Sequence, residues 1–218
     1  MECLKHAALD LGDVLQEIQT PDFGSVLDVS KMEMKPKETV DLFAEKKRKG
    51  WDKTVEARCD FSRHPGMVRR SGLFFLSLWR KTLFGRTLTD IKGDDSMVDF
   101  FADNLSALIA DVLGQQLSKG DWCIITTPKR RHLVKNFATR ISEAIASRLG
   151  IPFYEDVCSC RTKQRVNAVF TVNRIPKEQN VIVFDDFVTT GQTLQAMQRA
   201  LEPYQKYLFN VVGINNKL

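Results

Sequence analysis

The sequence predicts an α/β protein with a mostly parallel sheet flanked by helices, and two sets of observations lead to this prediction. Residues 122–126 and 181–184 form short apolar runs without polar alternation, as do strands that are covered on both faces. Residues 137–150 and 194–201 follow these runs and have apolar side chains at helical spacing. Strands and helices therefore alternate along the chain, which is typical of a parallel sheet.

The chain has 218 residues, which suits one large domain or two small ones. We place the core in residues 96–218 and a mixed, mainly helical extension of unknown role in residues 1–95. Within the extension, residues 1–19 have helical spacing, and residues 58–86 predict a buried helix or a strand pair. The basic run at residues 44–53 is typical of a solvated helix end, although the nearby Trp51 also allows a nucleic-acid contact.

The clearest helical pattern in the chain covers residues 97–117. Asp95 or Ser96 can cap its N-terminus. Its apolar stripe consists of Phe100, Phe101, Leu105, Leu108, Ile109, Val112 and Leu113. We expect this stripe to pack on the sheet just before the strand that starts at Trp122.

The segment from Val181 to Leu194 is the most informative part of the sequence. Its apolar strand leads to Asp185 and Asp186, and then to the TTGQT loop (residues 189–193) at the start of a helix. Small side chains, one glycine and the N–H groups of a helix N-terminus attract a phosphate. Carboxylates beside a phosphate need donor groups, and ribose hydroxyls supply them. The residue types therefore predict a site for a ribose 5-phosphate.

This segment resembles the PRPP-binding motif of the type I phosphoribosyltransferases, which implies a phosphoribosyltransferase-like core. The resemblance implies that Asp185 and Asp186 are catalytic and bind the ribose 2- and 3-hydroxyls. It also implies that the 5-phosphate binds to Thr189, Thr190, Gly191, Gln192 and Thr193. The alternative is an ordinary turn between a strand and a helix. The sequence contains neither G-x-x-x-x-G-K-[ST] nor G-x-G-x-x-G, so it does not predict those nucleotide sites.

A second loop follows the strand at residues 122–126. In the same family the corresponding loop holds the pyrophosphate of PRPP, which here implies Thr127, Lys129, Arg130 and Arg131. Residues 128–174 contain ten basic and three acidic side chains, and such a surplus concentrates anions. A solvated basic turn is the alternative, and a nucleic acid would benefit from the same charge.

The exposed segment CRTKQR, residues 160–165, occupies the position of the family's flexible lid, where Arg161, Lys163 and Arg165 are candidates for contacts with pyrophosphate. We count Arg161 and Lys163 among the catalytic candidates; an exposed basic hairpin is the alternative. The order of segments most resembles the ComF-like branch of the family, from Lys135-Asn136-Phe137-Ala138 onward. The lid is shorter than expected for that branch, and its four-cysteine zinc module is missing.

The chain has five cysteines and no C-x-x-C pair. Cys158 and Cys160 would share one face of a strand, which allows a metal or redox role, but buried apolar packing is more common. Without a signal peptide or an apolar run long enough to span a membrane, we expect a cytoplasmic protein that does not enter a membrane.

The resemblance implies displacement at ribose C1 of PRPP, with Mg²⁺ held mainly by PRPP and no metal ligand assigned to the protein. The acceptor, a base or amine, is unidentified. Threonine at position 189 cannot act as an acid or base at neutral pH, so we expect neither hypoxanthine nor guanine. The alternative is a PRPP-binding sensor or ComF-like factor in nucleic-acid metabolism or DNA uptake. Further candidate partners are a nucleic acid and a second copy of the chain, as a homodimer.

Overall fold

The computed structural model describes residues 57–128, 135–160 and 169–217. They belong to one compact unit that spans residues 46–218. The expected helix at residues 1–19 and the basic run at residues 44–53 lie outside the described residues. No helix in the described part of the chain has the length and apolar character needed to cross a membrane.

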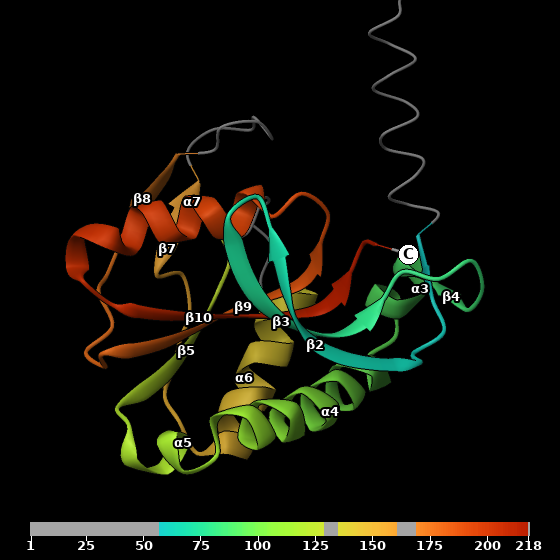
Figure 1. Cartoon of the computed structure of the whole chain (residues 1–218), viewed down its shortest axis with the longest axis horizontal. Coiled ribbons are helices and arrows are strands. Elements are labelled where there is room, and N and C mark those ends of the chain that lie inside the picture. The colour runs from blue at the N-terminus through green and yellow to red at the C-terminus, as the bar shows by residue number, and fades with distance from the viewer. Residues whose placement is uncertain (1–56, 129–134, 161–168, 218) are drawn as a thin grey trace, which may run out of the picture. The chain divides into compact units, whose positions relative to one another are not determined.

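A six-stranded sheet organises this unit, with the strand order β2-β3-β10-β9-β5-β6 (Figure 1). The strands are β2 (Arg63–Arg70), β3 (Leu73–Arg80), β5 (Trp122–Thr126), β6 (Phe153–Tyr154), β9 (Asn180–Val188) and β10 (Tyr207–Asn215). All neighbours pair in parallel except the edge strand β2, which runs antiparallel to β3. The predicted mostly parallel sheet is confirmed.

Helices cover both faces of this sheet. The helices are α3 (Leu88–Gly93), α4 (Ser96–Leu113), α5 (Gln115–Lys119), α6 (Phe137–Leu149) and α7 (Gln192–Leu201), which a 3₁₀ turn (Glu202–Tyr204) follows. Figure 1 shows α4 and α6 on one side of the sheet and α7 on the other. β5 and the first part of β9 lie between these helices and are therefore apolar on both faces, as the sequence predicted.

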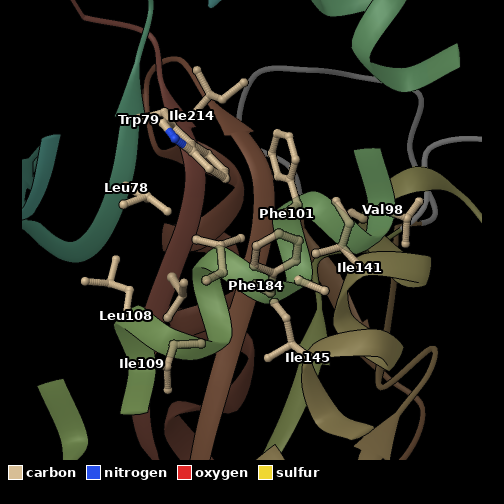
Figure 2. Close-up of a cluster of buried hydrophobic side chains, with 14 of the residues drawn as sticks. Leu78, Trp79, Val98, Phe101, Leu108, Ile109, Ile141, Ile145, Phe184 and Ile214 are labelled. Atoms are coloured by element: carbon tan, nitrogen blue, oxygen red, sulfur yellow. The ribbon is translucent and has the colours of Figure 1, made fainter. Parts of the chain in front are cut away.

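The side chains of β9 alternate between two apolar clusters. Ile182 and Phe184 pack with the residues of α4 and α6, whereas Val181 and Val183 pack with those of α7. Figure 2 shows Phe184 among Phe101, Ile141 and Ile145. Full burial of a large apolar side chain contributes about 1.5–3 kcal/mol to the free energy of folding. The side chains of β9 therefore stabilise the packing of helices on both faces of the sheet.

The helix expected at residues 97–117 is divided in two. Gly114 has a φ of 50° and separates α4 from α5. Asp95 makes no capping bond with its side chain, and instead the Asp94 carboxylate accepts from the backbone N–H of Ser96 at 3.0 Å. Phe100 and Val112 of the predicted stripe are exposed, although the ring of Phe100 still stacks on that of Trp79 in β3, with centroids 5.5 Å apart.

Residues 58–86 form strands, which confirms the strand pair among the two predicted alternatives. β2 and β3 are joined by a two-residue turn at Ser71 and Gly72, both with positive φ. Next to them, β1 (Arg58–Cys59) pairs antiparallel with β4 (Arg86–Thr87). β3 lies in the predicted extension and pairs with β10 of the predicted core. A domain boundary between residues 95 and 96 would therefore cut through the sheet.

The predicted helix at residues 137–150 is present, and short strands follow it. Helix α6 begins after Asn136, whose side chain accepts from the N–H of Thr139 at 2.8 Å, and ends at Gly150 with a φ of 65°. The segment that follows supplies the short strand β6 and then β7 (Cys158–Cys160). β7 pairs antiparallel with β8 (Phe170–Val172) outside the main sheet, so residues 161–168 connect two paired strands.

Candidate functional site

The two loops predicted to bind a ligand start at adjacent strands of the sheet. β5 and β9 are parallel neighbours, so their carboxyl ends lie at the same edge. Thr127 is buried just after β5, and its hydroxyl donates a hydrogen bond to Oδ1 of Asp185 on β9 at 3.3 Å. Its backbone N–H donates to the carbonyl of Phe184 at 3.2 Å. The structure thus brings together Thr127 and Asp185, which are 58 residues apart in the sequence.

The strand that carries the two aspartates is longer than predicted. β9 continues to Val188, and Asp185 and Phe187 are paired with Val212 and Ile214 of β10. The expectation that the strand ends at residue 184 is wrong, because β10 provides pairing partners for the following residues. Asp185 and Asp186 therefore have strand geometry, in which successive side chains point to opposite faces.

Asp186 is paired with a lysine that the sequence analysis did not identify. Nζ of Lys92, in the last turn of α3, lies 2.6 Å from Oδ2 of Asp186. The Asp186 side chain is 12% exposed and that of Lys92 is 44% exposed. No sequence pattern links these positions, since they come together only when α3 packs beside the sheet.

The TTGQT loop connects β9 to α7. Thr189 and Thr190 are exposed, and Gly191 has a φ of 82° at the N-cap position of α7. The hydroxyl of Thr190 accepts from the N–H of Gln192 at 3.5 Å. Because glycine supplies no side-chain acceptor at the N-cap, the N–H groups of Thr193 and Leu194, which follow Gln192 in the first turn, are available to an anion. Gln192 and Thr193, the last two predicted phosphate ligands, form this first turn.

The predicted basic side chains of the site lie outside the described residues. These are Lys129, Arg130 and Arg131 of the first loop, and Arg161, Lys163 and Arg165 of the lid. Their flanking elements are described. In the sequence, residues 129–134 lie between β5 and α6, and residues 161–168 lie between β7 and β8, whose residues Cys160 and Phe170 pair with each other.

The cysteines provide little support for a metal or redox role. Cys158 is buried, and burial raises the pKa of its thiol to about 11. Burial, together with Glu178, raises the pKa of Cys123 to about 12. Such thiols hold their protons at neutral pH, and the thiolate is the form that binds metals. The described ranges contain no group of three or more His, Cys, Asp or Glu side chains that could hold a metal ion.

The fold and the position of these residues define an α/β protein with polar groups gathered at the carboxyl edge of a mostly parallel sheet, where such sheets bind ligands. No protein-family model matches the chain. No curated protein matches it either.

Solved structures similar to the chain include several phosphoribosyltransferases. An adenine phosphoribosyltransferase is 17% identical over 69% of this chain and 84% of its own, with a TM-score of 0.43. An orotate phosphoribosyltransferase from Aeropyrum pernix is 18% identical over 76% of this chain and 78% of its own, with a TM-score of 0.41. The adenine phosphoribosyltransferase from Saccharomyces cerevisiae is 18% identical over 69% of this chain and 83% of its own, also with a TM-score of 0.41.

Proposed function

We propose that this protein binds PRPP with Mg²⁺ and transfers the phosphoribosyl group to a base or amine, releasing pyrophosphate. The observation that carries the proposal is the contact between Thr127 and Asp185 at the edge where the TTGQT loop begins. The contact joins the segment that we assign to pyrophosphate with the segment that we assign to ribose. A single ligand with both groups fits such an arrangement.

Each segment has a distinct role in the proposed reaction. The TTGQT loop holds the 5-phosphate, and the carboxylates of Asp185 and Asp186 accept from the ribose hydroxyls and so hold the ring in line for displacement. As the C1–O bond breaks, its electron pair leaves with pyrophosphate, and the acceptor nitrogen forms the new bond to C1. Lys129, Arg130, Arg131, Arg161 and Lys163 are the residues that we propose to stabilise the growing negative charge.

The described residues suit a Mg²⁺ ion that is held mainly by its substrate. Mg²⁺ is commonly bound by one or two carboxylates together with phosphate oxygens, and not by a cage of protein ligands. Asp185 and Asp186 point to opposite faces of β9, so at most one of the two carboxylates would face such an ion, and PRPP would supply most of its ligands. When bound, the ion would neutralise charge on the pyrophosphate.

A non-catalytic PRPP sensor, or a ComF-like factor in nucleic-acid metabolism or DNA uptake, is the second candidate. The ion pair between Lys92 and Asp186 favours it, because that carboxylate already has a cationic partner. In this version the site recognises PRPP, and the protein signals its presence without turnover.

Calorimetry with Mg²⁺ and PRPP, followed by a screen for pyrophosphate release across bases and amines, tests the proposal. We expect the wild type to bind and the double variant Asp185→Asn/Asp186→Asn to lose binding. Asp111→Asn is the matched control, because Asp111 is an exposed carboxylate on α4. Equal binding by the double variant would contradict both candidates, as would no binding by the wild type. Binding without turnover would select the sensor, and tight, salt-sensitive DNA binding would select its nucleic-acid form.

A further inference from the structure

The end of the β2–β3 hairpin contacts the carbonyl groups that lead into the TTGQT loop. Nη1 of Arg70, the last residue of β2, donates to the carbonyl oxygen of Thr189 and, at 3.4 Å, to that of Val188. Nη2 of the same guanidinium donates to the side-chain oxygen of Asn215, which is buried at the end of β10. One arginine therefore connects β2 with the ends of both β9 and β10.

The turn of the hairpin extends these contacts to α7. The hydroxyl of Ser71 donates to the carbonyl of Thr190 at 3.4 Å. Nε2 of Gln195, in the first turns of α7, donates to the carbonyl of Ser71. The hairpin thus contacts the last carbonyl of β9, two successive carbonyls of the loop and one side chain of α7.

These contacts fix the direction of the loop's N–H groups. In a planar trans peptide the carbonyl of one residue and the N–H of the next point in opposite directions. Because the carbonyls of Thr189 and Thr190 accept from the hairpin, the N–H groups of Thr190 and Gly191 point away from it. The carbonyl of Val188 also accepts from the N–H of Asn216 at 2.9 Å. The N–H groups of Thr190 and Gly191 are the donors that the proposed function assigns to the 5-phosphate.

We propose that Arg70 is a positioning residue for the 5-phosphate, holding the backbone donors of the TTGQT loop in place before the ligand arrives. This inference rests on the proposed function. An arginine suits the task because its planar group presents several donors in a rigid fork, whereas lysine offers a single flexible ammonium. The guanidinium also adds positive charge behind the loop.

The test measures binding of ribose 5-phosphate and of inorganic pyrophosphate, each with Mg²⁺, by calorimetry. For Arg70→Ala we expect ribose 5-phosphate to bind about tenfold more weakly, as the loss of one well-ordered charged hydrogen-bond partner predicts, with pyrophosphate binding unchanged. Arg70→Lys should also bind ribose 5-phosphate more weakly than the wild type. Arg69→Ala is the matched control, since Arg69 is exposed and its guanidinium lies over the ring of Phe74 at 5.6 Å.

Amide NMR spectra supply a readout that a loss of stability would not mimic. In the wild type, ribose 5-phosphate should shift the N–H signals of Thr190 and Gly191, and these shifts should shrink in Arg70→Ala. Gln195→Ala, which removes only the contact between α7 and the hairpin turn, should have a smaller effect of the same kind. Wild-type affinity in Arg70→Ala, or equal loss of both ligands, would overturn the inference. A wild type that binds no ribose 5-phosphate would instead overturn the proposed function.

Discussion

Asp185 and Asp186 are neighbours in the sequence, yet their carboxylates have different partners. Asp185 accepts from Thr127, just after β5, whereas Asp186 is paired with Lys92 on α3. Strand geometry explains the difference, because consecutive side chains leave a strand on opposite faces. In the proposed site, Asp185 is therefore closer to the pyrophosphate segment, and Asp186 connects the site to the residues that precede α4.

Replacing Lys92 with methionine tests the electrostatic role of this second connection. The lysine offsets the charge of a carboxylate beside the proposed binding site for a polyanion. Without it, we expect Mg²⁺-PRPP to bind about three- to fivefold more weakly at low salt, within the range of a partly exposed ion pair, and the difference to shrink in high salt. Calorimetry at two salt concentrations measures both effects.

The control for this variant is Lys119→Met. Lys119 is exposed on α5 and donates to the side chain of Gln115, so its loss should leave PRPP binding unchanged. Tighter binding by Lys92→Met would contradict the electrostatic role, because it would mean that Lys92 competes with the ribose for Asp186.

At the scale of elements, the apolar patterns were sufficient to predict the strands β5 and β9 and the helices α4, α6 and α7. Their periodicity follows directly from burial on one or both faces. The extension of β9 beyond Phe184 was not predictable, because polar aspartates stay in the strand only through pairing with β10. The break at Gly114 was also missed, since the apolar pattern continues past it.

The same contrast applies to the candidate site. The sequence was sufficient to predict that Thr127 and the aspartates share one edge, because the carboxyl ends of parallel strands meet there. It gave no indication of Lys92 or Arg70. Both contact the motif through packing between segments far apart in the chain: 119 residues separate Arg70 from Thr189.

The packing of β10 against α4 leaves room only for a glycine at position 213. A Cβ there would lie 2.8 Å from Cε1 of Phe101 and 2.9 Å from the carbonyl oxygen of Asp186. We expect Gly213→Ala to lower the free energy of unfolding by about 1–3 kcal/mol through overpacking, and to displace the strand segment that carries Asp186. Urea denaturation measures the first effect and PRPP calorimetry the second.

Gly66→Ala is the matched control for this variant. Gly66 also lies in a strand of the sheet, but a Cβ at this position would meet nothing within 4 Å. Its free energy of unfolding should change by about 0.5 kcal/mol or less. If both variants lost the same free energy of unfolding, then a Cβ at either strand position would be destabilising. This result would contradict the role given to close packing beside Asp186.

At the scale of the whole molecule, the β2–β3 hairpin is both a part of the sheet and a support for the candidate site. β3 pairs with β10 in parallel, and Leu76, Leu78 and Trp79 belong to the apolar cluster under α4 and α6. Figure 2 shows Leu78 and Trp79 in this cluster with Phe101. The residues before position 96 therefore contribute to the stability of the core as well as to its proposed ligand site.

Two fragments of the chain test this contribution. A fragment of residues 46–218 retains the hairpin and should unfold in one cooperative transition. A fragment of residues 96–218 lacks the buried side chains of β3 (Leu73, Phe75, Leu76, Leu78 and Trp79). Because each contributes about 1.5–3 kcal/mol, their loss equals the whole stability of a typical domain, about 5–15 kcal/mol. It also exposes an unpaired edge of β10, which favours aggregation.

We therefore expect the shorter fragment to lack a cooperative thermal transition in circular dichroism and to elute as aggregates in size-exclusion chromatography. The longer fragment should elute as a defined species and bind ribose 5-phosphate with the affinity of the full chain, since it retains Arg70 and the loop that Arg70 contacts. If residues 96–218 unfolded cooperatively at the same temperature as residues 46–218, the hairpin would be an accessory to the sheet, and the boundary predicted between residues 95 and 96 would describe a core that folds independently.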